Sequence, residues 1–400
     1  MKKLCVIVLC AVIFAVSCGN GAGNGTGNTA RAASSEPVIT EWAKQNKIDD
    51  GSQTTEELYE LAKAEGKVVV YSISSRISNI KQTFEKQYPG ITADVYDIAT
   101  NELYEKITRE IDAGVYNADI IHIKDEDGMI YTEMVMPGKF TLYYPGDIAS
   151  HIPESSRRYS MPLYVELAQW FYNYELFDGP PVSSWWDLTR PEWKGRLVMQ
   201  EPTQGKTYLI NFTAFVANAD LFERDYERVF GEKLVLSPGC PTAGHELIKR
   251  LFDNDIVFES SSDSVCLAVG TPGQKGPGML GWGASSKLRK NESDGWVLAP
   301  INMTPGTSLH NQNNLYVVTN AAHPNAAKLF IRWMLGEADG KGPGFSPFNT
   351  LGGWSVRDDV IPAEGNPLLG DVLTLEADPS WLYQNVPEIQ DFWTALQAGR

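Results

Sequence analysis

The chain has 400 residues, of which 43% are apolar and 11% aromatic, so it is long enough to bury a large core and to fold as two lobes. Its 34 basic and 50 acidic residues give a net charge of −16 at pH 7, which argues against nucleic acid as a partner. The same charge does not exclude a small anionic ligand, because hydroxyl groups, an arginine or a helix N-terminus can bind an anion locally.

The first residues predict a secretory signal. Lys2 and Lys3 precede an apolar run over residues 4–16 that is too short to span a bilayer as a mature helix. Small residues stand just before Cys18, in a pattern that resembles the lipobox of bacterial lipoproteins. This resemblance implies that residues 1–17 are a lipoprotein signal peptide and that Cys18 carries the lipid, while ordinary cleavage nearby would leave Cys18 as a plain thiol. The mature chain would hold 32 basic and 50 acidic residues, a net charge of −18.

Residues 18–50 begin with a stretch rich in Gly, Asn, Ser and Thr that lacks an apolar period, so we expect a flexible tether here. The folded part would then be lipid-anchored in the cell envelope, on the outer face of the cytoplasmic membrane or in the periplasm. Such a compartment permits a disulfide between Cys240 and Cys266, although their spacing does not decide whether they pair. The chain has no CxxC motif and no Cys/His cluster, so we expect no metal and no other cofactor.

The first folded element is predicted to be a helix that begins after Thr54. Thr54 and Glu57 have the spacing of a capping box, and Gly66 provides a stop signal. The inward face of this helix is expected to carry Leu58, Leu61 and Ala62.

Residues 67–97 then predict a strand, a helix and a second strand. Residues 68–71 are β-branched or aromatic, which is typical of a buried parallel strand that ends near Ser72. Apolar residues at three- and four-residue steps predict the helix, and residues 91–96 alternate like a second strand. Such a unit closes with parallel strands and a crossover helix, so the turn 72–76 should lie at the carboxyl edge of the sheet.

Ligands bind at this edge in open α/β sheets, and a helix N-terminus there offers free N–H groups. Three serine hydroxyls and one guanidinium in the turn suit an anion. A helix N-cap formed by Ser74 or Ser75 is an equal alternative, and one serine can serve both purposes. The first-lobe ligand candidates are therefore Ser72, Ser74, Ser75 and Arg76.

A second β-α-β step follows. We expect a helix from residue 100 or 101 to Gly114 and a buried strand over residues 118–123. The acidic turn 124–128 comes next and should lie at the same sheet edge. Its acids suit a cationic ligand group, but a solvated charged turn is the commoner meaning of such a run, and we adopt that interpretation.

From residue 159 to 177 the sequence becomes extended and rich in aromatic residues, which we interpret as a crossing into a second lobe. There a strand over residues 196–200 leads through the polar turn 203–207 into a helix over residues 208–217, so a polar turn again opens a helix. Two helices are expected next, at residues 221–230 and 245–252. A Gly- and Ser-rich region without predicted elements follows at residues 253–286, and then a strand at residues 296–301.

The chain is then expected to cross back over residues 302–314 and to complete the first lobe with a strand at 315–319 and a helix at 325–335. The expected organisation is a signal at 1–17, a tether at 18–50, the first lobe at 51–165, the second lobe at 166–305, and a return to the first lobe with C-terminal helices at 306–400, the lobe of 343–400 being left open.

Several segments between residues 58 and 335 resemble bacterial ABC-transporter solute-binding proteins of the type II periplasmic fold, in the branch named for ferric iron binding. The similar segments are LYELAKAEGKVVVYS, FEKQYPGI, ADIIHI, SSWWDLTRPEWKGRLVM and AAKLFIRWMLGEADG, of which the fourth is fairly specific. The resemblance implies an α/β fold of two lobes, each a mainly parallel sheet flanked by helices, joined by two crossing strands. It also implies a monomeric binding protein rather than an enzyme, with a solute in the interlobe cleft and delivery to an ABC permease in the inner membrane.

The resemblance does not by itself imply iron. Ferric-binding members carry adjacent tyrosines from the second lobe, whereas this chain has residues 279–286 there and no tyrosine pair; Tyr143 and Tyr144 are adjacent but lie in the first lobe. Members that bind organic anions use hydroxyls, N–H groups and a few bases. We therefore expect an organic anion, such as a phosphonate, a sugar phosphate or a carboxylate, with ferric iron as the alternative and a secreted hydrolase using Ser, His and Asp as a second alternative. The second-lobe ligand candidates are Thr203, Lys206, Thr207 and Ser285.

Overall fold

The computed structural model describes residues 36–399, and Pro37–Arg400 belong to one compact unit. The signal peptide, the lipid on Cys18 and the first part of the tether fall outside the described residues. Within residues 36–399, no helix combines the length and the apolar character that a bilayer crossing requires.

The tether that was expected to reach residue 50 gives way to folded structure earlier. Helix α1 (Glu41–Gln45) lies inside that range, and both Ala43 and Ile48 are buried in the core of the first lobe. Lys328 donates a hydrogen bond of 2.7 Å to the carbonyl of Asn46. The expectation was wrong for this part, because its few apolar residues cover a core that composition alone does not reveal.

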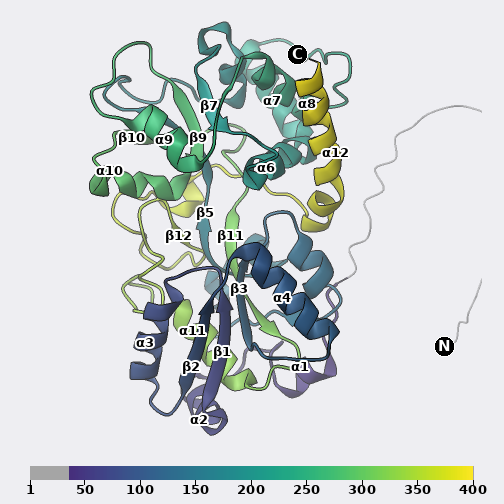
Figure 1. Cartoon of the computed structure of the whole chain (residues 1–400), viewed down its shortest axis with the longest axis vertical. Coiled ribbons are helices and arrows are strands. Elements are labelled where there is room, and N and C mark those ends of the chain that lie inside the picture. The colour runs from purple at the N-terminus through teal and green to yellow at the C-terminus, as the bar shows by residue number, and fades with distance from the viewer. Residues whose placement is uncertain (1–35, 400) are drawn as a thin grey trace, which may run out of the picture. The chain divides into compact units, whose positions relative to one another are not determined.

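The first sheet has seven strands in the order β12-β5-β11-β3-β1-β2, with β4 beside β11 (Figure 1). β1 pairs in parallel with β2 and β3, as the β-α-β pattern predicted, whereas β11 pairs antiparallel with β3 and β5. The carboxyl ends of β1 and β3 therefore meet at one edge. The strands are β1 (Lys67–Ser72), β2 (Thr92–Asp97), β3 (Ile120–Lys124), β4 (Phe140–Thr141), β5 (Met161–Glu166), β11 (Asn311–Val318) and β12 (Trp354–Ser355).

Helices cover both faces of this sheet. α3 and α11 share one core with Val70 of β1, while α4 shares another with Ile121 of β3. The capping box of α2 is formed as predicted and Gly66 ends the helix with φ 71°, but Leu61 is 43% exposed rather than inward. The helices are α2 (Thr55–Glu65), α3 (Ile77–Gln87), α4 (Thr100–Asp112), α5 (Glu154–Arg157) and α11 (Pro324–Met334), with a π-helical turn η1 (Tyr131–Val135) and a 3-10 turn η2 (Ala149–His151).

The second sheet has five strands in the order β10-β6-β9-β7-β8. β7 pairs in parallel with β8 and β9, and β6 pairs antiparallel with β9 and β10. Both sheets are therefore mixed, with parallel pairing in the β-α-β part and antiparallel pairing where the crossing strands enter. The expectation that each sheet is mainly parallel was wrong, because the crossing strands and their neighbours pair antiparallel. The strands are β6 (Ala168–Asn173), β7 (Leu197–Gln200), β8 (Val257–Glu259), β9 (Leu280–Ala284) and β10 (Leu298–Ile301).

The Gly- and Ser-rich region of the second lobe is more regular than expected, since it contains β8, α9 (Ser262–Gly270) and β9. A Cβ on Gly281 would lie 2.9 Å from the Val269 side chain, and a Cβ on Gly283 would lie 2.7 Å from Cys266 Sγ. Glycine at these positions lets α9 lie close against β9. The high glycine content therefore reflects close packing of α9 on β9, whereas we had interpreted it as a sign of irregular structure.

Two segments cross between the sheets, as predicted. Only Leu167 separates β5 of the first sheet from β6 of the second, and the chain returns through residues 302–310 into β11. The remaining helices are α6 (Lys206–Ala217), α7 (Ala219–Phe230), α8 (Ala243–Asp253) and α10 (Lys290–Ser293), with 3-10 turns η3 (Trp185–Thr189), η4 (Pro191–Trp193), η5 (Ser285–Arg289) and η6 (Leu369–Asp371).

The C-terminal residues, whose lobe the sequence left open, divide between the two cores. Phe345 and Phe348 are buried in the core of the first lobe. Ile389 and Trp393 of α12 (Pro379–Ala398) are buried in the core of the second. Figure 1 shows α12, in yellow, running beside α6, with which it is in contact.

Candidate functional site

The first hydroxyl of the serine turn after β1, that of Ser72, forms its hydrogen bonds within the first lobe. Ser72 is fully buried, its Oγ lies 2.9 Å from His122 Nδ1, and it accepts a hydrogen bond of 3.1 Å from the Ser74 N–H. Ser74 is half-buried and Ser75 is exposed. Helix α3 begins after Arg76 without a side-chain cap, so the capping alternative for the two serines is not formed. Ser72 therefore orients a histidine that the sequence analysis did not select.

His122 lies on β3 directly beside Ser72 of β1. It is fully buried, and its Nε2 has no hydrogen-bond partner among residues 36–399. Burial, assisted by the positive charges of Lys124 and Arg76, lowers the pKa of His122 to about 3. The imidazole is therefore neutral at pH 7, and its Nε2 can donate or accept one hydrogen bond with a ligand, depending on the tautomer.

Aromatic rings surround this histidine. The Phe348 ring stacks on Tyr164 with a centroid distance of 4.8 Å and meets the His122 ring edge-on at 5.8 Å. The guanidinium of Arg76 lies over the Phe348 ring, 5.4 Å from its centroid, which is a cation–π geometry. Phe348 thus brings the predicted base of the serine turn next to a tyrosine of the crossing strand β5.

Charges from both lobes act on Tyr164. Burial raises the pKa of Tyr164 well above its usual value and Glu166 adds to this effect, whereas Arg76 and Arg289 oppose it. Arg289 ends η5 in the second lobe, and Lys124 Nζ lies 3.5 Å from Glu166 Oε2. Arg76, Lys124 and Glu166 therefore gather here, and the charge of the exposed Arg289 also acts on Tyr164. We call this cluster the crossing site: Arg76, His122, Lys124, Tyr164, Glu166, Arg289 and Phe348.

Two residues of the polar turn of the second lobe are bonded to acidic residues of the first lobe. Lys206 Nζ lies 2.7 Å from Asp127 Oδ2, and Thr207 Oγ1 donates a hydrogen bond of 3.0 Å to Glu126 Oε1. Thr203 is exposed and its hydroxyl donates to Glu201 of its own turn. Our interpretation of the acidic turn as solvated was wrong, because the turn binds across to the second lobe. We call Glu126, Asp127, Lys206 and Thr207 the interlobe latch.

A buried carboxylate fixes the acidic turn in place. Asp125 accepts hydrogen bonds of 3.0 Å from the Ile130 N–H and 2.8 Å from the Tyr131 N–H, where the π-helical turn begins. Burial, helped by the negative charge of Asp127, raises the pKa of Asp125 to about 7 against the effects of these two N–H groups and of Lys206. The loop that carries the latch acids is thus tied to the start of the π-helical turn.

The hydroxyl of Ser285 forms hydrogen bonds at the junction of the crossing strands. It is fully buried, its Oγ accepts a hydrogen bond of 2.9 Å from the Leu167 N–H, and it donates one of 2.5 Å to the Gly352 carbonyl. Gly352 has φ 77°, and a Cβ there would lie 2.0 Å from the Ser285 carbonyl oxygen. The hydroxyl therefore ties the segment that carries Phe348 to the residue between β5 and β6.

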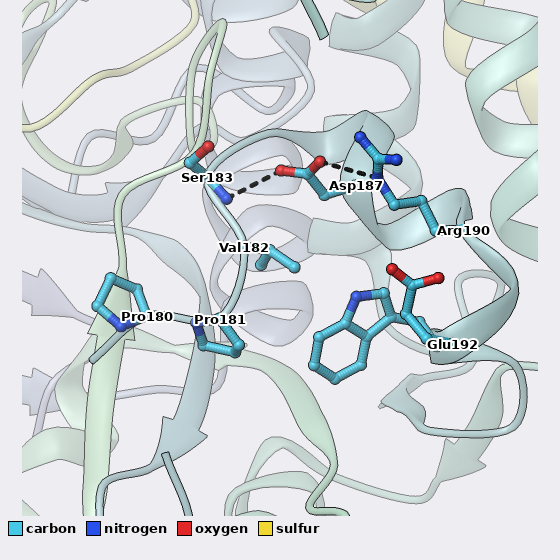
Figure 2. A pocket seen from close by; sticks show the side chains of 8 residues that line it. Pro180, Pro181, Val182, Ser183, Asp187, Arg190 and Glu192 are labelled. Atoms are coloured by element: carbon cyan, nitrogen blue, oxygen red, sulfur yellow. Dashed lines mark hydrogen bonds and ion pairs between the residues drawn. The ribbon is translucent and has the colours of Figure 1, made fainter. Parts of the chain in front are cut away.

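A cavity of about 360 Å³ lies in the second lobe, on the segment that carries the most specific part of the family resemblance (Figure 2). Asp187 accepts from the Ser183 N–H at 3.1 Å and from Arg190 Nε at 3.2 Å, so the one basic residue that lines the cavity is already paired with an acid. None of the predicted ligand residues lines this cavity, and it offers no free base. Its lining residues are Pro180, Pro181, Val182, Ser183, Asp187, Arg190, Glu192 and Trp193.

The other candidate chemistry of the chain lies apart from the crossing-site residues. Cys240 and Cys266 are both buried free thiols, so the disulfide that the compartment would permit is not formed. Within residues 36–399, one group of three His and acidic side chains has the spacing of a metal site: His151, Asp358 and Asp359.

Two mixed α/β sheets, joined by two crossing strands with a polar cluster beside the crossing, define a two-lobed periplasmic binding protein. Residues 51–341 match the family described as bacterial extracellular solute-binding protein, so the chain belongs to that family. The family implies a small solute and an ABC permease as partners. A search of curated protein sequences gave no significant match.

Solved structures show the same fold. Iron-bound HitA from Pseudomonas aeruginosa has 14% identity and a TM-score of 0.59, covering 82% of this chain and 99% of its own. A FutA protein of Trichodesmium, in complex with iron and citrate, has 15% identity and a TM-score of 0.57, covering 83% and 99%. An ABC transporter structure from Clostridium perfringens has 16% identity and a TM-score of 0.60, covering 82% and 99%. At these identities the likeness establishes the fold alone.

Most of the crossing site was missed by the sequence analysis, which selected Arg76 and passed over Tyr164, Arg289 and Phe348. One signal was available for His122, because it interrupts the isoleucines of residues 120–123, the apolar part of the predicted strand. A polar residue in a buried strand needs partners, and Ser72 supplies only one of the two that an imidazole can use.

Proposed function

We propose that this chain is the lipid-anchored solute receptor of an ABC importer and that its solute is a small organic anion, such as a phosphonate, a sugar phosphate or a carboxylate, bound at the crossing site. One observation carries the proposal: the Arg76 guanidinium lies 5.4 Å from the centroid of Phe348, the ring that stacks on Tyr164, and Arg76 forms no ion pair within residues 36–399. The charge of the exposed Arg289 of the second lobe also acts on Tyr164. A guanidinium without an acidic partner favours an anion, since it can donate charge-assisted hydrogen bonds.

The proposal keeps only part of the predicted ligand set. Arg76 remains the first-lobe base, and Ser72 acts through His122. The hydroxyl of Ser285 and the side chains of Lys206 and Thr207 already bind protein acceptors. The Thr203 hydroxyl and N–H both donate to Glu201, so Thr203 leaves the donor set. The hydroxyls of Ser74 and Ser75 remain near the first-lobe turn, where an extended solute could reach them.

Ferric iron is the second candidate, because HitA and the Trichodesmium protein are described with bound iron. A ferric ion requires several anionic oxygens. At the crossing site Tyr164 and Glu166 are the residues of that kind, and burial holds the pKa of Tyr164 high, which disfavours its phenolate. The local excess of bases therefore favours the organic anion.

The test is native mass spectrometry of the purified, untagged protein, because tightly bound solutes often survive purification. We expect wild type to carry an organic anion that Arg76→Ala loses. Arg224→Ala is the matched control, since Arg224 is 65% exposed and pairs only with Asp220 of its own helix. A ferric mass, or a red colour with ferric citrate from a tyrosinate band that Arg76→Ala retains, would replace the organic anion by iron.

The same proposal makes the protein a receptor that binds one solute and releases it unchanged. Incubation of the released solute with fresh protein should therefore return it at its original mass. A stoichiometric excess of a cleaved product would instead support the hydrolase alternative. Gel filtration of the soluble form should give a monomer.

A further inference from the structure

Strand β11 carries buried amide groups that the protein leaves unpaired. Asn313 is 1% exposed, and neither its Oδ1 nor its Nδ2 has a hydrogen-bond partner among residues 36–399. Asn311 Oδ1 and His122 Nε2 are buried and unpaired in the same part of the chain. Most buried polar groups in native proteins have partners, so a set of unpaired atoms calls for a molecule that would pair with them.

The strand register places these groups on one face of the first sheet. Asn313 pairs with Tyr164 of β5 on one side and with Lys124 of β3 on the other, so the three side chains form one cross-strand row. Asn311 lies opposite Glu166, two residues along, and therefore on the same face. His122 precedes Lys124 by two residues and shares that face too. The unpaired atoms thus adjoin the charges of the crossing site.

We infer that Asn311, Asn313 and His122 form a neutral recognition row for hydroxyl groups of the solute, which makes the solute a hydroxylated organic anion. The inference rests on the proposed function, because it takes the crossing site as the place where the anion binds. An amide offers one acceptor and two donor hydrogens, and a neutral imidazole offers one of each. A hydroxyl group both donates and accepts, so it satisfies these groups, whereas the charged end of the solute would bind the guanidinium groups.

A site built to bond hydroxyl groups rejects an analogue that lacks them, since its buried polar atoms are then left unpaired. The experiment therefore uses two probe pairs in calorimetric titrations: D-gluconate against hexanoate, and glycerol 3-phosphate against propyl phosphate. We expect wild type to prefer the hydroxylated member of at least one pair by about tenfold or more. In Asn313→Leu this preference should fall to within about threefold.

Asn314→Leu is the matched control, because Asn314 is equally buried on the same strand but points to the opposite face. It should keep the wild-type preference. Thermal melting checks folding: Asn313→Leu should melt no lower than wild type in the absence of solute, because the amide that it removes is unpaired. If Asn313→Leu fails to fold, Asn311→Leu at the less buried position replaces it, with the same expectation.

The outcomes separate this inference from the proposed function. Anion binding without preference for a hydroxylated member, or a preference that both asparagine variants keep, overturns the recognition row and leaves the anion receptor standing. A large loss of melting temperature in both Asn313→Leu and Asn311→Leu shows that the amides have structural partners, such as ordered water, and overturns it as well. If no probe binds and the purified protein carries no organic anion, the proposed function fails first.

Discussion

The contact between Lys206 and Asp127 gives a prediction that separates a latch from a ligand contact. If Lys206 holds the lobes together, Lys206→Met and Asp127→Asn should weaken solute binding to a similar extent, because both shift the population toward separated lobes. If Lys206 instead binds the anion, Asp127→Asn should strengthen binding, since it frees the ammonium group. The two roles thus predict opposite signs for one substitution.

The magnitude follows from the geometry of the latch. The Lys206 to Asp127 distance is 2.7 Å, but the lysine side chain is 55% exposed, so solvent screening limits the pair to about 0.2–1 kcal/mol. The 3.0 Å hydrogen bond from Thr207 to the Glu126 carboxylate adds about 1–1.5 kcal/mol. The double variant Lys206→Met/Thr207→Val should therefore shift the lobe equilibrium by about 1–2.5 kcal/mol, or roughly five- to seventyfold.

Two measurements check this expectation on the soluble form of the protein. Small-angle scattering without solute should give a larger radius of gyration for the double variant, and calorimetry with the solute released from wild type should give a lower affinity within that factor. Lys194→Met is the control, because Lys194 is 59% exposed and pairs with Asp255 inside the second lobe. Tighter binding by Asp127→Asn at an unchanged radius would refute the latch.

Three further substitutions test the anchor, the acidic turn and the C-terminal helix. Cys18→Ser, expressed with its signal in a bacterium, should leave the membrane fraction, and its retention there would contradict the lipid anchor. The pKa of Asp125 is raised to about 7 from an unfolded value of about 3.9, so the native state binds more protons and stability should fall as pH rises from about 4 to 7. Urea denaturation at pH 5 and pH 8 should show a smaller fall for Asp125→Asn than for wild type, and equal falls would remove Asp125 as the cause. Ile389→Ala should lower the free energy of unfolding by about 2–5 kcal/mol, against about 0.5 or less for the exposed neighbour in Glu388→Ala, and similar values for the two would remove α12 from the second core.

The parts of the fold that depend on local pattern could be predicted from the sequence. The capping box at Thr54 and the β-α-β unit after it follow from spacing within a few residues, and the structure contains both. The prediction failed where a segment is shaped by a distant neighbour. By composition we assigned Gly283 to a region without regular structure, yet it is a strand residue whose missing side chain makes room for Cys266.

The candidate site was harder to predict for the same reason. Spacing placed Lys206 in the polar turn just before a helix, whereas the structure begins α6 at Lys206 itself. No local pattern could show that its partner is Asp127, which comes 79 residues earlier. Phe348 comes from a segment with little periodicity and meets His122 and Tyr164 only in the folded chain. Periodicity therefore identified the element that carries a side chain, while the partner of that side chain depended on the tertiary fold.

The latch also bears on how a protein with a net charge of −16 can favour an anion. Acids of the first lobe bind Lys206 and Thr207, so these groups already have partners before a solute arrives. Arg76 and Arg289 have no such acid among residues 36–399, and one comes from each lobe. An anion that contacts both would gain its second charge-assisted bond only while the lobes are close, so its binding would favour the same arrangement as the latch. For the proposed anion, the charge of the whole chain would then matter less to the affinity than two arginines that form no ion pair within the described residues.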